Sequence, residues 1–194
     1  MLFRSYWTSP RKLQRQADFL DAHPNYAICY HNVAILHEDG SQELWHPGRF
    51  VQKRETSTLE DLLVDNFIPG CSPMLRKGLF ENFPEWFNTA VWGDWPLYIL
   101  SAQHGEIGYI DELMGVYRVH SAGYWSGLSE TQQLKALIRF YRDTNRNLDI
   151  KYRNTVNTLI ARRSKDLALH KIRSIARRTL PVRVRRWLRA LRRL

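Results

Sequence analysis

The side chains best suited to chemistry lie in two short segments, GDWPL at 93–97 and YRVHS at 117–121. Asp94 stands where a helix is predicted to begin, and a helix N-terminus favours an ionised carboxylate, which can accept a proton. His120, 26 residues further on, follows an extended run at 107–119. A helix followed by a strand can bring both side chains to one rim of a sheet, where α/β proteins bind ligands.

Each residue also has a plainer structural interpretation. Asp is a preferred N-cap residue, so Asp94 could simply cap its helix, a role that is compatible with proton transfer. A lone histidine after a strand is more often a structural hydrogen-bonding residue than a ligand, and its ring can both donate and accept. The local pattern alone leaves both alternatives open.

The elements that must position these residues alternate between helix and strand. The pattern predicts a helix from Ser9-Pro10, a strand at 26–37, a short helix opened by a Ser57/Glu60 capping box, a proline-restricted edge or irregular strand at 67–75, an aromatic-rich loop at 85–92, a helix at 94–104 and a strand at 107–119. From Glu130 onward the apolar spacing is helical. The predicted fold class is therefore α/β, followed by an α-helical end.

Composition bounds the class of protein. The chain has 194 residues, 44% of them hydrophobic and seven of them Trp, which indicates a folded core. No apolar run reaches the roughly 18 residues of a membrane-spanning helix. Cys29 and Cys71 lie in apolar, strand-like contexts without a CxxC spacing, so we expect buried free thiols rather than a zinc site.

The net charge of +10 is distributed unevenly. Residues 151–194 hold 15 Lys or Arg and one acid, whereas residues 1–150 are mildly acidic. Such an asymmetry marks two segments with different roles.

Several segments of the chain also recur, in the same order, in bacterial family 2 glycosyltransferases. They are SYWTSPRKLQRQ at 5–16, YHNV at 30–33, NFIP at 66–69, GDWPL at 93–97, and GYIDE at 108–112 through YRVHS at 117–121. Over residues 6–129 the chain therefore resembles that family, whose GT-A fold has a nucleotide-binding half followed by an acceptor-binding half. The resemblance implies that residues 1–130 form the acceptor-binding half, with a partial GT-A-like mixed sheet, and that residues 131–194 form a helical, basic extension.

The resemblance also implies roles for single residues. Asp94 matches the base that takes the proton from the acceptor hydroxyl. His120 matches a position that contacts the metal or the diphosphate. Arg118 is a candidate phosphate partner, or else a solvated strand end. Trp92 and Trp125 are candidate surfaces for stacking sugar rings, the alternative being core packing, which we expect for Trp95.

The chain departs from the family at its front. Full-length relatives carry an acidic cluster before the residues that match Tyr6-Trp7, and its carboxylates hold a divalent cation, Mn or Mg. Here those positions are Leu2-Phe3-Arg4-Ser5. We therefore expect the cation only in a complete enzyme, and weak donor binding by this chain alone. A truncated gene product, a fragment from an internal start and half of a split enzyme all remain open.

The basic tail has three interpretations. After Pro181 the sequence predicts a helix with an apolar stripe beneath an arginine face, which is typical of a helix lying in a membrane interface. The predicted membrane-contact residues are Arg183, Arg185, Arg186, Trp187, Leu188, Arg189 and Leu191. Packing against the missing half is the second interpretation. Non-specific nucleic-acid binding is the third, and the sequence has no fold signature for it.

Together these observations predict an inverting family 2-like glycosyltransferase that moves a sugar from a nucleotide-sugar donor to a glycan or lipid-linked acceptor and is truncated and inactive alone. The alternative is a non-catalytic remnant that binds a membrane or a protein partner. The sequence predicts a cytoplasmic location and leaves open a peripheral position at the inner face of the membrane. No specific nucleic acid is expected as a partner.

Overall fold

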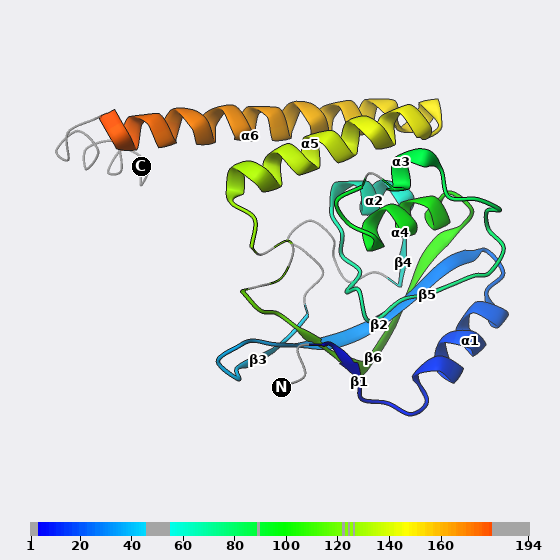
Figure 1. Cartoon of the computed structure of the whole chain (residues 1–194). Coiled ribbons are helices and arrows are strands. Elements are labelled where there is room, and N and C mark those ends of the chain that lie inside the picture. Colours follow the sequence, from blue (N-terminus) through cyan, green and yellow to red (C-terminus); the bar gives the residue numbers. More distant parts are fainter. Residues whose placement is uncertain are drawn as a thin grey trace. The chain divides into compact units, whose positions relative to one another are not determined.

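The computed structural model describes residues 4–45, 55–88, 90–121, 123, 125 and 127–179. The chain divides into two compact units, Met1–Gly127 and Leu128–Leu194 (Figure 1). We call them the sheet unit and the hairpin unit and describe each by itself.

The strands of the described residues form one mixed sheet in the sheet unit. They are β1 (Tyr6–Trp7), β2 (Tyr26–Leu36), β3 (Gln42–Leu44), β4 (Thr56–Ser57), β5 (Met74–Leu75) and β6 (Glu106–Arg118). The order is β1-β6-β2-β3, with β4 pairing β6 and β5 pairing β2. The two long strands predicted at 26–37 and 107–119 are thus confirmed, and they belong to one sheet.

The centre of the sheet is the parallel pair of β2 and β6, which runs from Tyr26 opposite Glu106 to Leu36 opposite Arg118, with register shifts after Tyr26 and on both sides of Asn32. Every other pairing in the described sheet is antiparallel. Residues 27–34 of β2 are all buried, so side chains on both faces of this strand are covered, as is usual for parallel strands. The YHNV segment, one of those on which the expected family resemblance rests, lies in this strand, and its residues are buried in the core.

Helices lie on both sides of this sheet (Figure 1). The sheet unit contains α1 (Lys12–Ala22), α2 (Leu59–Val64), α3 (Glu85–Asn88) and α4 (Asp94–Ala102). Figure 1 shows α2, α3 and α4 grouped together, with α1 apart from them. Helix α1 packs against β2. Leu62, Leu63 and Ile99 are fully buried where α2 and α4 pack.

Four local predictions need correction. Helix α1 begins at Lys12, after a turn at Ser9-Pro10. The capping box of α2 pairs Thr58 with Asp61, one residue later than predicted. The segment 67–75 is a strand only at Met74–Leu75, because its prolines have no N–H to donate and Ser72 N–H bonds to Pro69 O at 2.8 Å. The aromatic-rich loop at 85–92 contains the short helix α3.

The hairpin unit consists of two long helices, α5 (Glu130–Asn147) and α6 (Arg153–Thr179), joined through the short 3₁₀ helix η1 (Ile150–Tyr152). A capping box of Ser129 and Gln132 opens α5. The two helices run side by side in opposite directions (Figure 1), and His170 Nδ1 lies 2.9 Å from Glu130 Oε2 where α5 begins. The helical character predicted from Glu130 onward is confirmed as far as Thr179, and the helix predicted after Pro181 lies outside the described residues.

Two other expectations concern compartment and membrane. Both cysteines are free, but only Cys29 is buried, and Cys71 is partly exposed. Among the described residues, no helix combines the length and the apolar character needed to cross a bilayer. The predicted membrane-contact residues at 183–191 lie outside the described residues.

Candidate functional site

The parallel pairing of β2 and β6 brings the carboxyl ends of both strands to one edge of the sheet. Leu36 lies opposite Arg118, and Val119 N–H donates to Leu36 O at 3.0 Å. His120 is the next residue, just beyond this edge. The carboxyl ends of parallel strands are the usual place for ligands in α/β sheets, so the strand pairing alone puts His120 in a favourable position.

Asp94 is brought to its position by α4, of which it is the first residue. Its Oδ1 accepts a hydrogen bond from Trp95 N–H at 2.7 Å, which occupies one carboxylate oxygen. Gly93 is the N-cap residue and has no side chain with which to cap. The N-cap residue is therefore Gly93, one residue before the Asp94 that the sequence suggested. The Asp94 carboxylate still accepts a hydrogen bond from a backbone N–H of the first turn.

A hollow of about 590 Å³ lies between the start of α4 and the end of β6. Its volume falls in the range of small-molecule sites. It is lined by Val91, Trp92, Gly93, Asp94, Tyr117, Arg118, Val119, His120, Gly123 and Trp125. All five site residues predicted in this part of the chain therefore line a single hollow, which we call the Asp94 pocket.

Two tryptophans form an aromatic wall of the Asp94 pocket. The ring centroids of Trp92 and Trp125 are 4.9 Å apart, at an interplanar angle of 54°. Both rings are partly exposed, whereas Trp95 is buried and donates its Nε1–H to Leu62 O at 2.9 Å. Trp95 packs in the core as predicted, and the other two rings are left accessible to a ligand.

The Asp94 carboxylate is close to two phenols that the sequence did not single out as site residues. Burial raises the pKa of Tyr98, and the negative charge of Asp94 raises it further. The same two causes, in the same order, raise the pKa of Tyr117. Both phenols therefore stay protonated at neutral pH and can act as hydrogen-bond donors.

Gly70 is another residue that sequence reasoning missed. A Cβ added to Gly70 would lie 3.5 Å from Asp94 Oδ2, so this glycine borders the second carboxylate oxygen. The NFIP segment that precedes it gave the one available signal, since it is among the segments on which the expected resemblance to family 2 transferases rests. Tyr117 had a similar signal, because it opens the YRVHS segment.

Arg118 and His120 also border a second hollow of about 340 Å³, which is lined in addition by the last residue of β2 and by residues of the turn that follows it. The backbone holds both residues in place, since Arg118 N–H donates to Ser5 Oγ at 3.1 Å and Gly123 N–H donates to His120 O at 3.0 Å. The two side chains thus lie where two adjoining spaces meet.

The described residues show no cluster of metal-ligating side chains. Over the described parts of the chain, no three His, Cys, Asp or Glu side chains gather in a way that could hold a metal ion. In the Asp94 pocket Asp94 and His120 are the lining residues of these types. Mg binds proteins through one or two carboxylates and completes its shell with waters and substrate phosphates. The described lining supplies one carboxylate, so it could contribute a single ligand but does not by itself hold a resident Mn or Mg ion.

Comparisons with known proteins give a partial match. No family model matches the chain. Proteins of Mycobacterium tuberculosis and Mycobacterium bovis, each described as uncharacterized, are 35% identical to it over 121 residues, which is 62% of this chain and 34% of theirs. The chain thus spans about a third of the length of the curated relatives it matches.

Proposed function

We propose that the chain is the acceptor-binding part of an inverting, family 2-like glycosyltransferase with a partial GT-A-like sheet. One observation carries the proposal: Trp92, Asp94, Arg118, His120 and Trp125, singled out from two separate stretches of sequence, line the same pocket. The complete enzyme would transfer a sugar from a nucleotide-sugar to a glycan or lipid-linked acceptor.

In this proposal Asp94 is the general base. Its Oδ1 is held by Trp95 N–H, which fixes the plane of the carboxylate and leaves Oδ2 for the acceptor hydroxyl. Proton transfer to Oδ2 makes the acceptor oxygen a stronger nucleophile as it attacks the anomeric carbon.

The aromatic wall would position the acceptor. A pyranose ring has an apolar C–H face, which can lie against the partly exposed rings of Trp92 and Trp125. Arg118 would bind an anionic group of the acceptor or of the donor phosphates. His120 would contact the ligand as a hydrogen-bonding residue.

No step of this proposal passes through a metal ion. Because the donor set around Asp94 does not fit one, we assign the donor, and any cation that accompanies it, to residues outside this chain. The prediction that this chain alone binds nucleotide-sugars weakly and shows no transfer follows directly, and calorimetry with a panel of nucleotide-sugars tests it.

Acceptor binding can be tested on the chain as it is. We expect saturation-transfer NMR with a panel of mono- and oligosaccharides to show a binder, and Trp125→Ala to weaken it by up to about tenfold, since an aromatic contact contributes about 0.5–1.5 kcal/mol. Phe83→Ala is the matched control, because Phe83 is an exposed aromatic residue of the same unit that does not line the pocket. Equal losses in both variants would contradict the proposal.

A further inference from the structure

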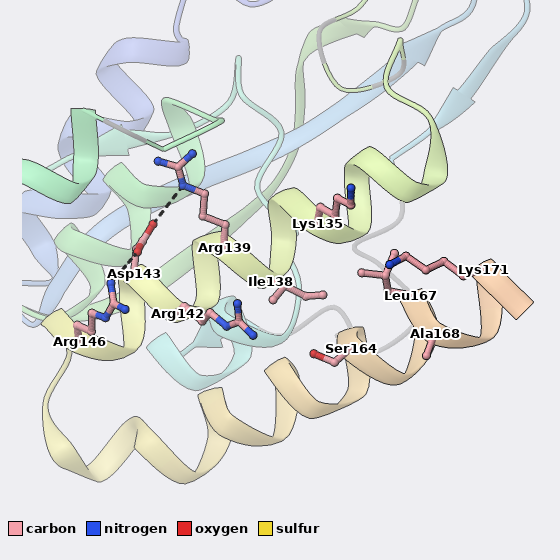
Figure 2. A pocket seen from close by; sticks show the side chains of 10 residues that line it. All are labelled: Lys135, Ile138, Arg139, Arg142, Asp143, Arg146, Ser164, Leu167, Ala168 and Lys171. Carbon is pink, nitrogen blue, oxygen red and sulfur yellow. Dashed lines mark hydrogen bonds and ion pairs between the residues drawn. The ribbon is translucent and has the colours of Figure 1, made fainter.

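The hairpin unit has a hollow of its own, in the groove between α5 and α6 (Figure 2). Its volume is about 440 Å³, and we call it the hairpin groove. It is lined by Lys135, Ile138, Arg139, Arg142, Asp143 and Arg146 of α5 and by Ser164, Leu167, Ala168 and Lys171 of α6. No residue of the sheet unit contributes to it, so this groove needs an explanation separate from that of the Asp94 pocket.

The rim of the groove is strongly cationic. Five of its lining residues are Lys or Arg, and Asp143 is the one carboxylate among them. Two arginines share that carboxylate: Arg139 Nε lies 3.7 Å from Asp143 Oδ2, and Arg146 Nη1 lies 3.4 Å from Asp143 Oδ1. Lys135, Arg142 and Lys171 form no ion pair with any described residue. Like charges that line one groove repel one another, so an anion in the groove would relieve the repulsion.

The floor of the groove is apolar. Ile138 is 6% exposed, and Figure 2 shows it between the two helices, near Leu167 of α6. Lys135 and Lys171 lie towards one end of the groove, and Arg142 and Arg146 lie towards the other. The surface thus offers cationic groups around a short apolar strip, and a small inorganic anion would leave the strip uncovered.

The apolar surface continues along α6 beyond the groove. Ile172 and Ile175 follow Ala168 at spacings of four and three residues, which keeps them on neighbouring positions of one helix face. They are 63% and 61% exposed, unusually high values for isoleucine. Two exposed isoleucines next to a cationic groove favour a ligand with an anionic head and an apolar chain.

We propose that the hairpin groove binds the phosphate headgroup of an anionic lipid, with the lipid chain against Ile172 and Ile175. The arginine guanidinium groups suit a phosphate, which they can contact through two hydrogen bonds at once. A nucleic acid would be the rival polyanion, but no lining residue is aromatic, so the groove has no surface on which a base can stack. This inference is independent of the function proposed for the Asp94 pocket.

Calorimetric titration of the full chain tests the proposal with soluble, short-chain lipids. The probes are a phosphatidic acid, a phosphatidylcholine with the same chains, inorganic phosphate and a single-stranded oligonucleotide. We expect the phosphatidic acid to bind at least about tenfold more tightly than either the phosphatidylcholine or inorganic phosphate, because it alone supplies both an accessible anionic head and an apolar chain.

Charge-neutral variants locate the binding. The triple variant K135Q/R142Q/K171Q should lose at least about tenfold in affinity for the phosphatidic acid, since each cation near an anionic headgroup contributes about 1 kcal/mol. The control R153Q/K165Q/R173Q removes the same charge from α6 positions that do not line the groove and should bind nearly as the original chain does. Glutamine is a good helix former, so both variants should keep their helical circular dichroism.

Ala168→Glu is a second test, because it adds a carboxylate to the groove at an exposed position. It should weaken phosphatidic-acid binding as strongly as the triple variant. Equal losses in the groove and control variants would show a general charge effect and overturn the proposal. Inorganic phosphate binding as tightly as the lipid would overturn it too, as would an oligonucleotide that binds more tightly and is lost in the same groove variant.

Discussion

The Asp94 pocket and the hairpin groove are assembled in opposite ways. The pocket combines residues 91–94 with residues 117–120, Gly123 and Trp125, and it depends on a strand pair whose partners, such as Leu36 and Arg118, are far apart in sequence. The groove is made by two helices that follow one another along the chain. The pocket has aromatic walls around one carboxylate, whereas the groove has cationic walls around an apolar floor. The cationic character of the groove follows from the composition of the hairpin unit, in which the basic residues of the chain are concentrated.

This difference can be measured because the two units carry different spectroscopic probes. Trp7, Trp45, Trp86, Trp92, Trp95 and Trp125 belong to the sheet unit, and Trp187 is the remaining tryptophan. The two longest helices belong to the hairpin unit. Tryptophan fluorescence therefore reports mainly on the sheet unit, and far-ultraviolet circular dichroism reports largely on the hairpin unit.

The largest expected effect concerns the hairpin unit. Ile138→Ala removes a nearly buried side chain between α5 and α6 and should lower the free energy of unfolding by about 2–5 kcal/mol. The change should appear in the denaturation midpoint by circular dichroism and much less in tryptophan fluorescence. Ile150→Ala is the control, because Ile150 is 72% exposed, and it should change little. Equal shifts in both signals would show that the two units unfold together.

A smaller effect is expected from the glycine that precedes β6. A Cβ at Gly105 would lie 2.5 Å from Asn25 O and 2.9 Å from Ala27 N, and backbone atoms cannot easily yield. Gly105→Ala should therefore destabilise the sheet unit by about 1–3 kcal/mol, seen as an earlier fluorescence transition in urea. Gly93→Ala meets no atom within 4 Å and serves as the control. If the two variants unfold at the same urea concentration, the backbone of residues 25–27 does not pack against Gly105 as described.

The smallest effect is a dependence on pH in the sheet unit. His31 is fully buried in β2, its Nδ1–H donates to Asn32 O at 2.8 Å, and its Nε2 has no hydrogen-bond partner. Burial lowers the pKa of His31 below its ordinary value of 6.5. Below about pH 6.5 the unfolded chain therefore takes up a proton that the folded chain does not, and stability falls as the pH falls, by at most about 1.4 kcal/mol per pH unit.

Urea denaturation monitored by fluorescence at several pH values measures this loss. Stability contributed by neutral His31 should be fully present above pH 6.5, and the variant His31→Gln should show a flatter dependence between pH 6.5 and 5.5. His37→Gln is a suitable control, because His37 is partly exposed beside Glu43. An equally steep dependence in all three proteins would assign the pH effect to other groups.

The sequence predicts the regular elements of both units better than their pairing. The strands at 26–37 and 107–119 and the helix from Glu130 carry strong periodic patterns, and the structure contains them. Strand β1 was missed because it has two residues and pairs with Val116 and Gly115, more than 100 positions away. The segment at 67–75 was overestimated because β-prone residues there alternate with prolines that cannot complete a ladder.

The residues that line the two hollows show the same limit of sequence-based prediction: contacts between distant segments are harder to predict than the segments themselves. The expected family resemblance pointed to Asp94 and His120 and gave Gly70 only an indirect signal through the NFIP segment, whereas nothing in the sequence indicated that Tyr98 lies close to the carboxylate. In the hairpin unit, the cationic stripe of α5 could be read from the spacing of Lys135, Arg139 and Arg142. Which residues of α6 face that stripe depends on how two helices pack, and side-chain spacing within one helix does not determine this.

The central claim is that Asp94 is the general base of a sugar transfer, and the most direct test is the turnover rate of a complete enzyme. Such an enzyme can be made by joining an N-terminal nucleotide-binding half from a longer family 2 transferase to this chain. Asp94→Asn keeps the size of the side chain and an oxygen for Trp95 N–H, so the account predicts unchanged donor binding and a rate about 10²–10⁴-fold lower. Asp21→Asn, at an exposed position of α1 that lines neither hollow, should leave the rate unchanged. A correctly folded Asp94→Asn enzyme that turns over as fast as the Asp21→Asn control would contradict the claim and leave Asp94 a structural residue of the first turn of α4.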